Sequence, residues 1–294
     1  MLVPSFTPAC PWHDRSGRLS LLKLATFVAL FLPAAWILWQ WWNGDLLPKQ
    51  VTEMIHQTGD WAVRLLMLSL FVTPLRRIAN WNKLITVRRM IGIAALAYAV
   101  THLSLYVVDQ RFDLVRVASE IALRIYLTIG FVTLLGLAAL GVTSTDAMIR
   151  RLGGKRWNRL HSLVYGLGAL ACLHYFMQSK IDATQATLIA GFFLYLMLFR
   201  LLLKFRLPIT AWTLTGLALA SGFGTVALEG AWYAFGTSAP WLRIMQANLT
   251  PDIMIRPAWY VLAAGLVLVL VSFVRQAPPE RAPLRLREKA TAQG

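Results

Sequence analysis

Eight stretches of the 294-residue chain are each apolar over about the length of a membrane-spanning helix. A helix that crosses a bilayer needs about 20 consecutive, mostly apolar residues. Hydrophobic residues make up 57% of the chain and the mean hydropathy is +0.58, outside the usual range of water-soluble domains. We therefore predict an all-α polytopic integral membrane helical bundle, with spans at about 21–42, 60–78, 89–108, 125–143, 158–178, 183–203, 208–228 and 257–274.

Basic residues gather at one end of successive spans. The chain has 29 Lys and Arg against 13 Asp and Glu, a formal net charge of +16. Cytoplasmic loops retain such residues, where they meet anionic lipid headgroups. Both termini are therefore expected in the cytoplasm. Because the basic residues lie at span ends and not on one continuous face, we predict membrane lipid and no nucleic acid as a partner. The basic segments lie at about 15–23, 76–89, 150–159, 204–206 and 275–289.

Two histidines inside the predicted spans, His102 and His174, lie at a similar depth. Counted from Arg89 and Arg159 as the inner span edges, both lie roughly 20 Å from the cytoplasmic face. An imidazole inside a bilayer usually faces the bundle interior and marks a proton, ion or cofactor site. Two histidines that face each other from neighbouring helices are suited to bind a b-type heme iron from both sides. A proton relay or an interhelical hydrogen bond is the alternative.

A third histidine, His161, begins the same span as His174 and lies near the inner face. On one ideal helix the two would be about 19.5 Å apart along the axis and about 140° apart around it. Either the helix is distorted or the two side chains meet different partners. The residues at a matching depth below His102 are Arg88 and Arg89, so His161 has no histidine mate. A heme ligand and a solvated interfacial side chain both remain open for it.

The chain has no GxGxxG after a strand, no P-loop, no CxxC and no HExxH. A heme membrane protein without a nicotinamide domain must receive electrons from quinol, a separate flavin reductase or a bound flavin. Arg88 and Arg89, with Trp81, Lys83 and Trp157, form a basic aromatic cytoplasmic surface suited to a flavin phosphate. Ordinary positive-inside loops explain the same residues.

Four stretches resemble one family of membrane proteins. They are IHQTGDWAVRLL from Ile55, ITVRRMIGIAALAYAVTHLSLY from Ile85, RIYLTIGFVTLLGLAALGVTSTDAMIRRLGGKRWNRLHSLVY from Arg124 and LHYFMQSKI from Leu173. They resemble the MsrQ family, the heme-binding membrane subunits of the MsrPQ protein-methionine-sulfoxide reductase systems. That family belongs to the wider ferric reductase-like transmembrane group, and the resemblance runs from about residue 20 to 205.

The resemblance implies a six-helix core that holds b-type heme, and FMN is also associated with the family. The intramembrane family histidines, the implied metal ligands, fall on His102, His161 and His174. The implied role is electron transfer in the bacterial inner membrane, from the quinone pool or a cytosolic flavin reductase. The implied acceptor is the periplasmic molybdopterin methionine sulfoxide reductase MsrP, which repairs oxidised periplasmic proteins. The chain would then carry electrons without catalysing sulfoxide reduction.

The resemblance, the spans and the composition together suggest four parts of the chain. They are a cytoplasmic N-terminal segment (1–20), a ferric reductase-like transmembrane heme domain (21–205), a two-helix C-terminal extension beyond the family core (206–274) and a Pro-rich, charged, disordered cytoplasmic tail (275–294). The extension, with a long outer loop at about 229–256, has no assigned chemistry. Two other functions remain open. One is a cytochrome-b-type ferric or quinone reductase, and the other is a proton-coupled transporter whose histidines form a proton path.

Overall fold

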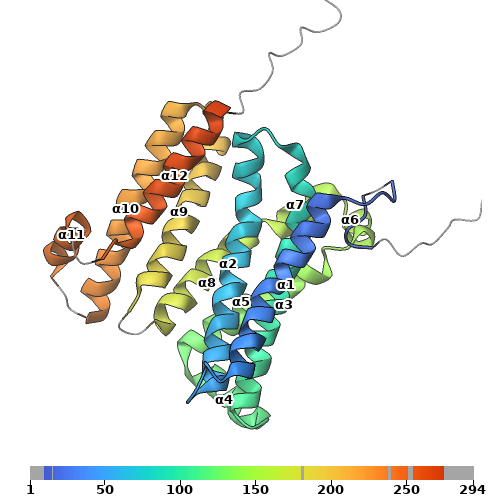
Figure 1. Cartoon of the computed structure of the whole chain (residues 1–294), viewed down its shortest axis with the longest axis vertical. Helices are drawn as coiled ribbons and strands as arrows, with labels where there is room; N and C mark the ends of the chain where they lie inside the picture. The colour runs from blue at the N-terminus through green and yellow to red at the C-terminus, as the bar shows by residue number, and fades with distance from the viewer. Residues whose placement is uncertain (1–9, 15, 180–181, 238–239, 251–253, 275–294) are drawn as a thin grey trace, which may run out of the picture.

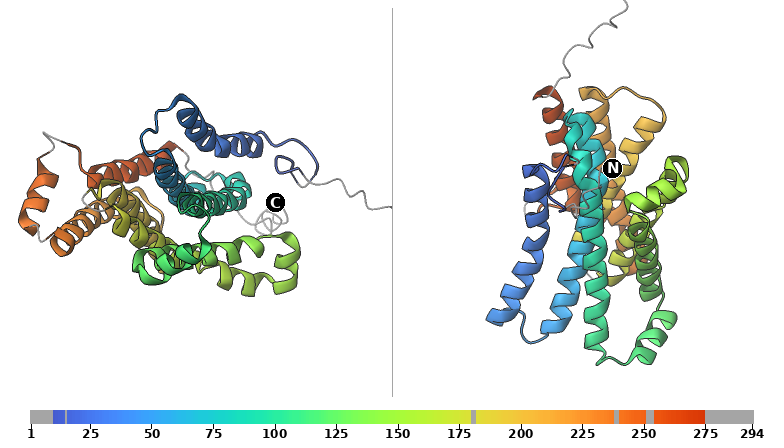
Figure 2. Two further views of the ribbon diagram at one scale, coloured as in Figure 1. Left: turned by 90° about the horizontal axis from the view of Figure 1, so that it is seen from below. Right: turned by 90° about the vertical axis from the view of Figure 1, so that its right-hand side faces the viewer.

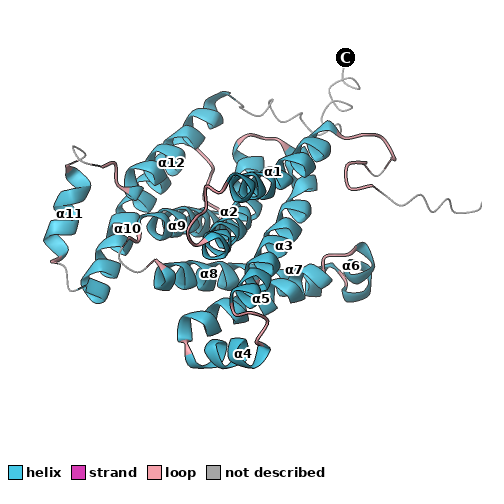
Figure 3. Cartoon of the chain, turned by 60° about the horizontal axis from the view of Figure 1, so that its bottom comes forward, coloured by secondary structure: helices cyan, strands magenta, loops and turns pink. Residues whose placement is uncertain are grey.

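The computed structural model describes residues 10–14, 16–179, 182–237, 240–250 and 254–274, and over these residues it contains helices and no strand (Figure 3). The predicted all-α bundle is confirmed. Each of the eight predicted spans falls largely in helix. The predicted disordered tail, 275–294, and residues 1–9 of the predicted N-terminal segment lie outside the described residues.

The eight long helices are α1 (Leu21–Asn43), α2 (Gln50–Ile78), α3 (Ile85–Asp109), α5 (Ile125–Val142), α8 (Val164–Gln178), α9 (Thr184–Lys204), α10 (Ala211–Thr237) and α12 (Pro257–Val274). The short helices are η1 (Asn82–Leu84), α4 (Leu114–Leu123), α6 (Asp146–Leu152), α7 (Gly154–His161) and α11 (Trp241–Leu249).

Within the described ranges, seven helical segments are long and apolar enough to cross a membrane. The predicted second span is not among them, because α2 also carries charged residues such as Glu53, Asp60 and Arg64. Asp60 and Arg64 form an ion pair at 3.3 Å, one helical turn apart. Buried positions run along α2 from Ile55 to Ile78. Neighbouring helices rather than lipid therefore cover much of this helix.

The predicted span 158–178 lies within one apolar helical segment, Gly154–Gln178, and this segment is distorted after His161. α7 ends at His161 and α8 begins at Val164, with a turn between them. In that turn the Ser162 hydroxyl donates a hydrogen bond to the Arg159 carbonyl oxygen at 2.6 Å. The spacing of His161 and His174 on one ideal helix therefore does not apply.

The predicted outer loop at 229–256 is also largely helical. α10 continues to Thr237, so Trp232 and Tyr233 are helical residues, and α11 (Trp241–Leu249) follows. Trp232 packs against Phe176 of α8 with ring centroids 5.0 Å apart. The Tyr233 hydroxyl accepts a hydrogen bond from the Ala183 amide at 3.3 Å. The first part of this segment, at the end of α10, therefore packs on the bundle.

α2 lies at the centre of the helix arrangement (Figure 1). It packs along α3 and also touches α1, α8, α9 and α12. α9, α10 and α12 form a group at one side, seen end-on in Figure 2, and α5 pairs with α8. One core cluster joins α1, α2, α3, α8 and α9, and a second joins the end of α2 to α9, α10 and α12. The two-helix extension thus packs on the rest through α9 and the end of α2.

The Tyr98 hydroxyl connects α3 to α1 beside a proline. It donates a hydrogen bond to the Leu30 carbonyl oxygen and accepts one from the Ala34 amide, both at 2.9 Å. Those two backbone groups would bond each other in a regular helix. Pro33 lies between them and lacks an amide hydrogen. The inserted hydroxyl satisfies both backbone groups and binds α1 to the bundle.

Helices α10 and α12 approach each other closely at Gly265. A Cβ atom at this position would lie 2.6 Å from the Ala218 Cβ atom and 3.0 Å from its Cα atom. Because one of these atoms is backbone, the helices would have to separate. We expect Gly265→Ala to destabilise the protein by about 1–3 kcal/mol, measured as a fall of a few degrees in the thermal unfolding midpoint in detergent.

Gly216→Ala is the matched control, because nothing lies within 4 Å of a Cβ atom built there. This variant should unfold at the wild-type temperature or slightly above it, since alanine favours helix over glycine. Equal midpoints for both variants would contradict the close packing of α10 on α12.

Candidate functional site

A cavity of about 650 Å³ lies between α2, α3, α4, α5 and α8. The His102 and His174 side chains line it from opposite walls. Most of the lining is apolar, whereas polar side chains gather where α4 and the ends of α3 and α8 meet. The cavity thus has an apolar interior, two imidazoles and a polar end.

His102 on α3 is held by the backbone of α2. Its Nδ1 atom lies 2.8 Å from the Ile55 carbonyl oxygen. A carbonyl oxygen only accepts, so Nδ1 carries the hydrogen and donates it. In a neutral imidazole the other nitrogen, Nε2, then carries a lone pair. His102 is therefore prepared to accept a proton or bind a metal through Nε2.

His174 on α8 is held in the same way by α5. Its Nδ1 atom donates to the Tyr126 carbonyl oxygen, also at 2.8 Å. The same arrangement therefore occurs twice: α3 carries an imidazole that α2 holds, and α8 carries one that α5 holds. Both imidazoles have the same tautomer. Metal-binding histidines in proteins are commonly fixed through Nδ1 in this way.

The structure brings the two imidazoles together. Their ring centroids are 6.4 Å apart and their planes are inclined at 82°. An imidazole nitrogen lies about 2 Å from a bound metal ion and about 1 Å from its own ring centroid, so two rings on opposite sides of one ion have centroids about 6 Å apart. The observed separation of His102 and His174 is that of one metal ion bound between them.

A glycine faces each imidazole at the position four residues after the carbonyl that holds it. A Cβ atom at Gly59 would lie 2.9 Å from the His102 Nδ1 atom, and one at Gly130 would lie 2.7 Å from the His174 Cε1 atom. Any other residue at these positions would push the ring away. The glycines thus allow the short contacts between the rings and the opposite helices.

His161 lies apart from this pair and is held differently. Its ring stacks on Trp157 with centroids 3.9 Å apart. Its Nε2 atom lies 3.1 Å from the Thr143 hydroxyl oxygen. The Thr143 hydroxyl also lies 2.8 Å from the Ala139 carbonyl oxygen, so its bond to His161 fits either tautomer of the imidazole. His161 would have to give up this hydrogen bond to bind a metal through Nε2.

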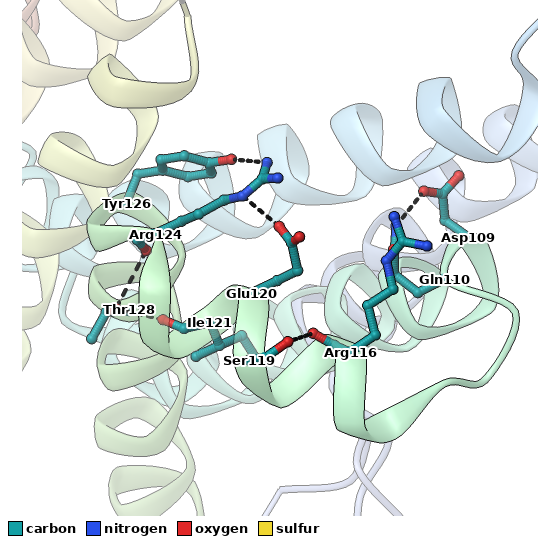
Figure 4. Close-up of polar contacts among 9 residues, drawn as sticks. All are labelled: Asp109, Gln110, Arg116, Ser119, Glu120, Ile121, Arg124, Tyr126 and Thr128. Atoms are coloured by element: carbon teal, nitrogen blue, oxygen red, sulfur yellow. Dashed lines mark hydrogen bonds and ion pairs between the residues drawn. The ribbon is translucent and has the colours of Figure 1, made fainter.

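The polar end of the cavity contains an ordered network along α4 (Figure 4). Arg124 forms an ion pair with Glu120 and donates to the Tyr126 hydroxyl at 3.1 Å. The Tyr126 hydroxyl and the Glu120 carboxylate raise the pKa of Arg124. Arg116, one turn earlier on α4, also lines the cavity. Two guanidinium groups therefore stand at the polar end, ready for an anionic group.

The predicted flavin surface is divided between partners. Arg89 donates to the Asp146 carboxylate at 2.6 Å, and the Trp157 indole donates to the Thr143 carbonyl oxygen at 2.9 Å. Arg88 acts electrostatically on His161 and is partly buried. Trp81 and Lys83 lie exposed before α3. Arg88 and Arg89 both act electrostatically on His161, on which Trp157 stacks. The assignment of these residues to a flavin remains a prediction.

Several residues of the site carry no clear signal in the sequence. The carbonyl oxygens of Ile55 and Tyr126 cannot be recognised from residue type, because every residue has one. Gly59 and Gly130 are recognisable only in retrospect, through their spacing of four from those carbonyls. Arg124 was visible only as a basic residue at a span edge.

Comparison with known proteins assigns the chain to a class. The family model of the ferric reductase like transmembrane component matches residues 58–172. The protein-methionine-sulfoxide reductase heme-binding subunit MsrQ of Rhodospirillum rubrum is 39% identical over 180 residues, covering 61% of this chain and 84% of that protein. The MsrQ subunit of Herminiimonas arsenicoxydans is 38% identical over 165 residues (56% and 76%). That of Xanthomonas campestris pv. campestris is 40% identical over 176 residues (58% and 80%). No solved structure matches.

The matched segment runs from α2 into α8, so the helices that enclose the cavity are those of a ferric reductase-like transmembrane protein. Within that class, the chain belongs to the MsrQ family, since it spans 84% of a relative at 39% identity. This membership agrees with the polytopic helical architecture.

The hydrogen bonds of His102 and His174 give a testable prediction about their tautomers. In cofactor-free protein, both neutral imidazoles should carry hydrogen on Nδ1. Solid-state ¹⁵N NMR of histidine-labelled protein distinguishes these forms. An Nε2–H form of His102 or His174 would contradict the contacts with α2 and α5.

Proposed function

We propose that the chain binds b-type heme between His102 and His174 and is the membrane electron-transfer subunit of a methionine sulfoxide reductase system. The observation that carries the proposal is the pair of imidazoles, 6.4 Å apart, each held through Nδ1 by the opposite helix. Heme bound there supplies reversible one-electron transfer at its iron. The names of the MsrQ relatives, which describe heme-binding subunits, support the same cofactor.

The cavity suits a porphyrin in several respects. Its volume of about 650 Å³ is in the range of ligand and cofactor pockets. Apolar side chains such as Val63, Leu66 and Leu134 line it. A flat, largely apolar ring can therefore lie between the imidazoles, with Nε2 of each directed to the metal. The fixed tautomers and the glycines opposite the rings keep both ligands ready, which lowers the entropy lost on binding.

The polar end of the cavity would set the orientation of the heme. Its two carboxylates are costly to bury in an apolar cavity, so they belong with the polar side chains near α4. Arg116 and Arg124 would hold them there through charge-assisted hydrogen bonds. Arg124 would then exchange its contact with Glu120 for one with a heme carboxylate.

The proposed donor and acceptor come from the resemblance to the MsrQ family, and the predicted orientation is compatible with them. Basic residues at the ends near α6 and α7 favour the cytoplasm on that side, so His102 and His174 lie toward the periplasm. We propose that electrons enter from the quinone pool or a cytosolic flavin reductase and leave to the periplasmic molybdopterin methionine sulfoxide reductase MsrP. The membrane is the bacterial inner membrane, with both termini cytoplasmic.

His161, Arg88 and Arg89 belong to the cytoplasmic part of the proposal. His161 would be a heme ligand nearer the cytoplasm, and it would have to give up its hydrogen bond to Thr143 to bind iron through Nε2. FMN, with its phosphate near Arg88 and Arg89, is the second proposed cofactor. Residues 21–205 form the proposed heme domain and 206–274 the extension, which packs on it through α9 and the end of α2.

The histidine pair predicts the heme content of variants. His102→Ala and His174→Ala should each lose the low-spin b-heme bound by that pair, because one axial ligand is missing. Gly59→Ala and Gly130→Ala should weaken binding of the same heme, because the new methyl group would displace the imidazole ring of His102 or His174. Heme per polypeptide and the dithionite-reduced spectrum of purified protein measure both effects.

Gly166→Ala is the control, because no atom lies within 4 Å of a Cβ atom built at Gly166. It should retain the wild-type spectrum. Full heme content in both histidine variants would refute the pairing. A wild-type protein without b-heme bands, after expression with ample heme, would refute heme binding and favour the proton-path alternative.

The acceptor is tested by reoxidation. Protein reduced under anaerobic conditions should be reoxidised faster by MsrP together with methionine sulfoxide than by either alone, followed at the heme absorption band. The same measurement with ferric citrate tests a ferric reductase acting on a small acceptor. Acceleration by ferric citrate and none by MsrP with methionine sulfoxide would count against the proposed acceptor.

A further inference from the structure

Arginines from three helices gather at the end of the bundle away from α4. Arg76 and Arg77 end α2, Arg88 lies in the first turn of α3, and Arg200 lies one turn before the end of α9. The end of α2 packs on α9, because Ile78 and Leu75 share a core cluster with Phe199, the neighbour of Arg200. The Arg77 and Arg88 charges act electrostatically on Arg200. The heme proposal uses neither Arg76 nor Arg200.

The Arg200 side chain is held by a ring contact, but two of its nitrogen atoms have no hydrogen-bond acceptor in the described part of the chain. Its guanidinium carbon lies 4.2 Å from the centroid of the Tyr165 ring, a cation–π contact. Its Nε and Nη2 atoms are buried and have no hydrogen-bond partner among the described residues. The Nε atom of Arg76 is also buried and has no hydrogen-bond partner among the described residues. Buried guanidinium donors without acceptors are costly, particularly at membrane depth.

Acidic side chains of the described residues do not compensate these charges. The four ion pairs over that part of the chain join Asp60 to Arg64, Asp146 to Arg89, Glu120 to Arg124 and Glu229 to Arg256. None of them includes Arg76, Arg88 or Arg200. The buried donors of Arg76 and Arg200 therefore lack an acidic partner among the described residues, and an anion from outside these residues would satisfy them.

We propose that Arg200, with Arg88 and Arg76, binds a phosphate group at the predicted cytoplasmic end of the bundle, where the ends of α2 and α9 adjoin the start of α3. Planar guanidinium groups present paired donors that match the oxygens of a phosphate. Stacking on the Tyr165 ring holds the Arg200 guanidinium group in place. The phosphate belongs either to FMN or to an anionic phospholipid headgroup, since both sources offer the same anion at this depth.

This inference refines the proposed flavin site and does not depend on the His102–His174 heme. It replaces Arg89, which already pairs with Asp146, by Arg200 and Arg76 as the phosphate-binding partners of Arg88. The b-heme spectrum serves as an independent check, because loss of phosphate binding should leave the heme of the histidine pair unchanged.

The test compares Arg200→Gln with Lys204→Gln in the full-length protein with its heme. Both variants remove one positive charge from α9, and Lys204 is exposed at the helix end. In nanodiscs of phosphatidylcholine, FMN and riboflavin binding are measured by flavin fluorescence. Phospholipid retained from the cell membrane is identified by native mass spectrometry.

For the flavin source, we expect wild type to bind FMN more tightly than riboflavin, and Arg200→Gln to weaken FMN binding by about 10- to 100-fold. For the lipid source, wild type should retain phosphatidylglycerol or cardiolipin that Arg200→Gln loses. Lys204→Gln should behave as wild type in either case, and Arg200→Lys should recover only part of the binding, because lysine lacks the paired donors.

The proposal would be overturned if Arg200→Gln bound FMN as tightly as wild type does and also retained as much anionic phospholipid. Loss of heme from Arg200→Gln with unchanged phosphate-ligand binding would also overturn it, because the cluster would then serve heme carboxylates. A wild-type heme spectrum beside lost phosphate binding would support the proposal.

Discussion

The contact between an imidazole Nδ1–H group and a backbone carbonyl oxygen on a neighbouring helix organises this protein. It occurs twice, from His102 to Ile55 and from His174 to Tyr126, both at 2.8 Å. Each bond fixes a tautomer and a ring direction, and together they place two lone pairs in one cavity. A glycine one turn along each acceptor helix is required for the approach. The proposed heme site depends on this repeated arrangement.

α2 connects the functional regions of the molecule. Its first half supplies Ile55 and Gly59 to the cavity, its last turn supplies Arg76 to the arginine cluster, and its end packs on the extension through Ile78. A helix with so many partners can carry charges that a lipid-facing helix avoids. This explains why its composition is the least typical of a membrane span.

The sequence predicted the helical class, most span positions and the similar depth of His102 and His174, because hydropathy and the rise per residue depend only on residue order. It left open whether the helix between His161 and His174 is distorted, and the structure shows a two-residue turn at Ser162 and Leu163. It also missed the helical continuation through Trp232. Local composition there suits either an interface or a helix packed on its neighbours.

The sequence by itself therefore determined that the chain is a multi-pass helical membrane protein with histidines inside its spans. Only the tertiary structure decided which histidines meet, because the direction of a side chain depends on how the helices are packed and rotated. It brought His102 and His174 within 6.4 Å of each other and left His161 on Trp157 and Thr143. It also revealed the unsatisfied donors of Arg200, because hydrogen-bond partners come from helices distant in sequence.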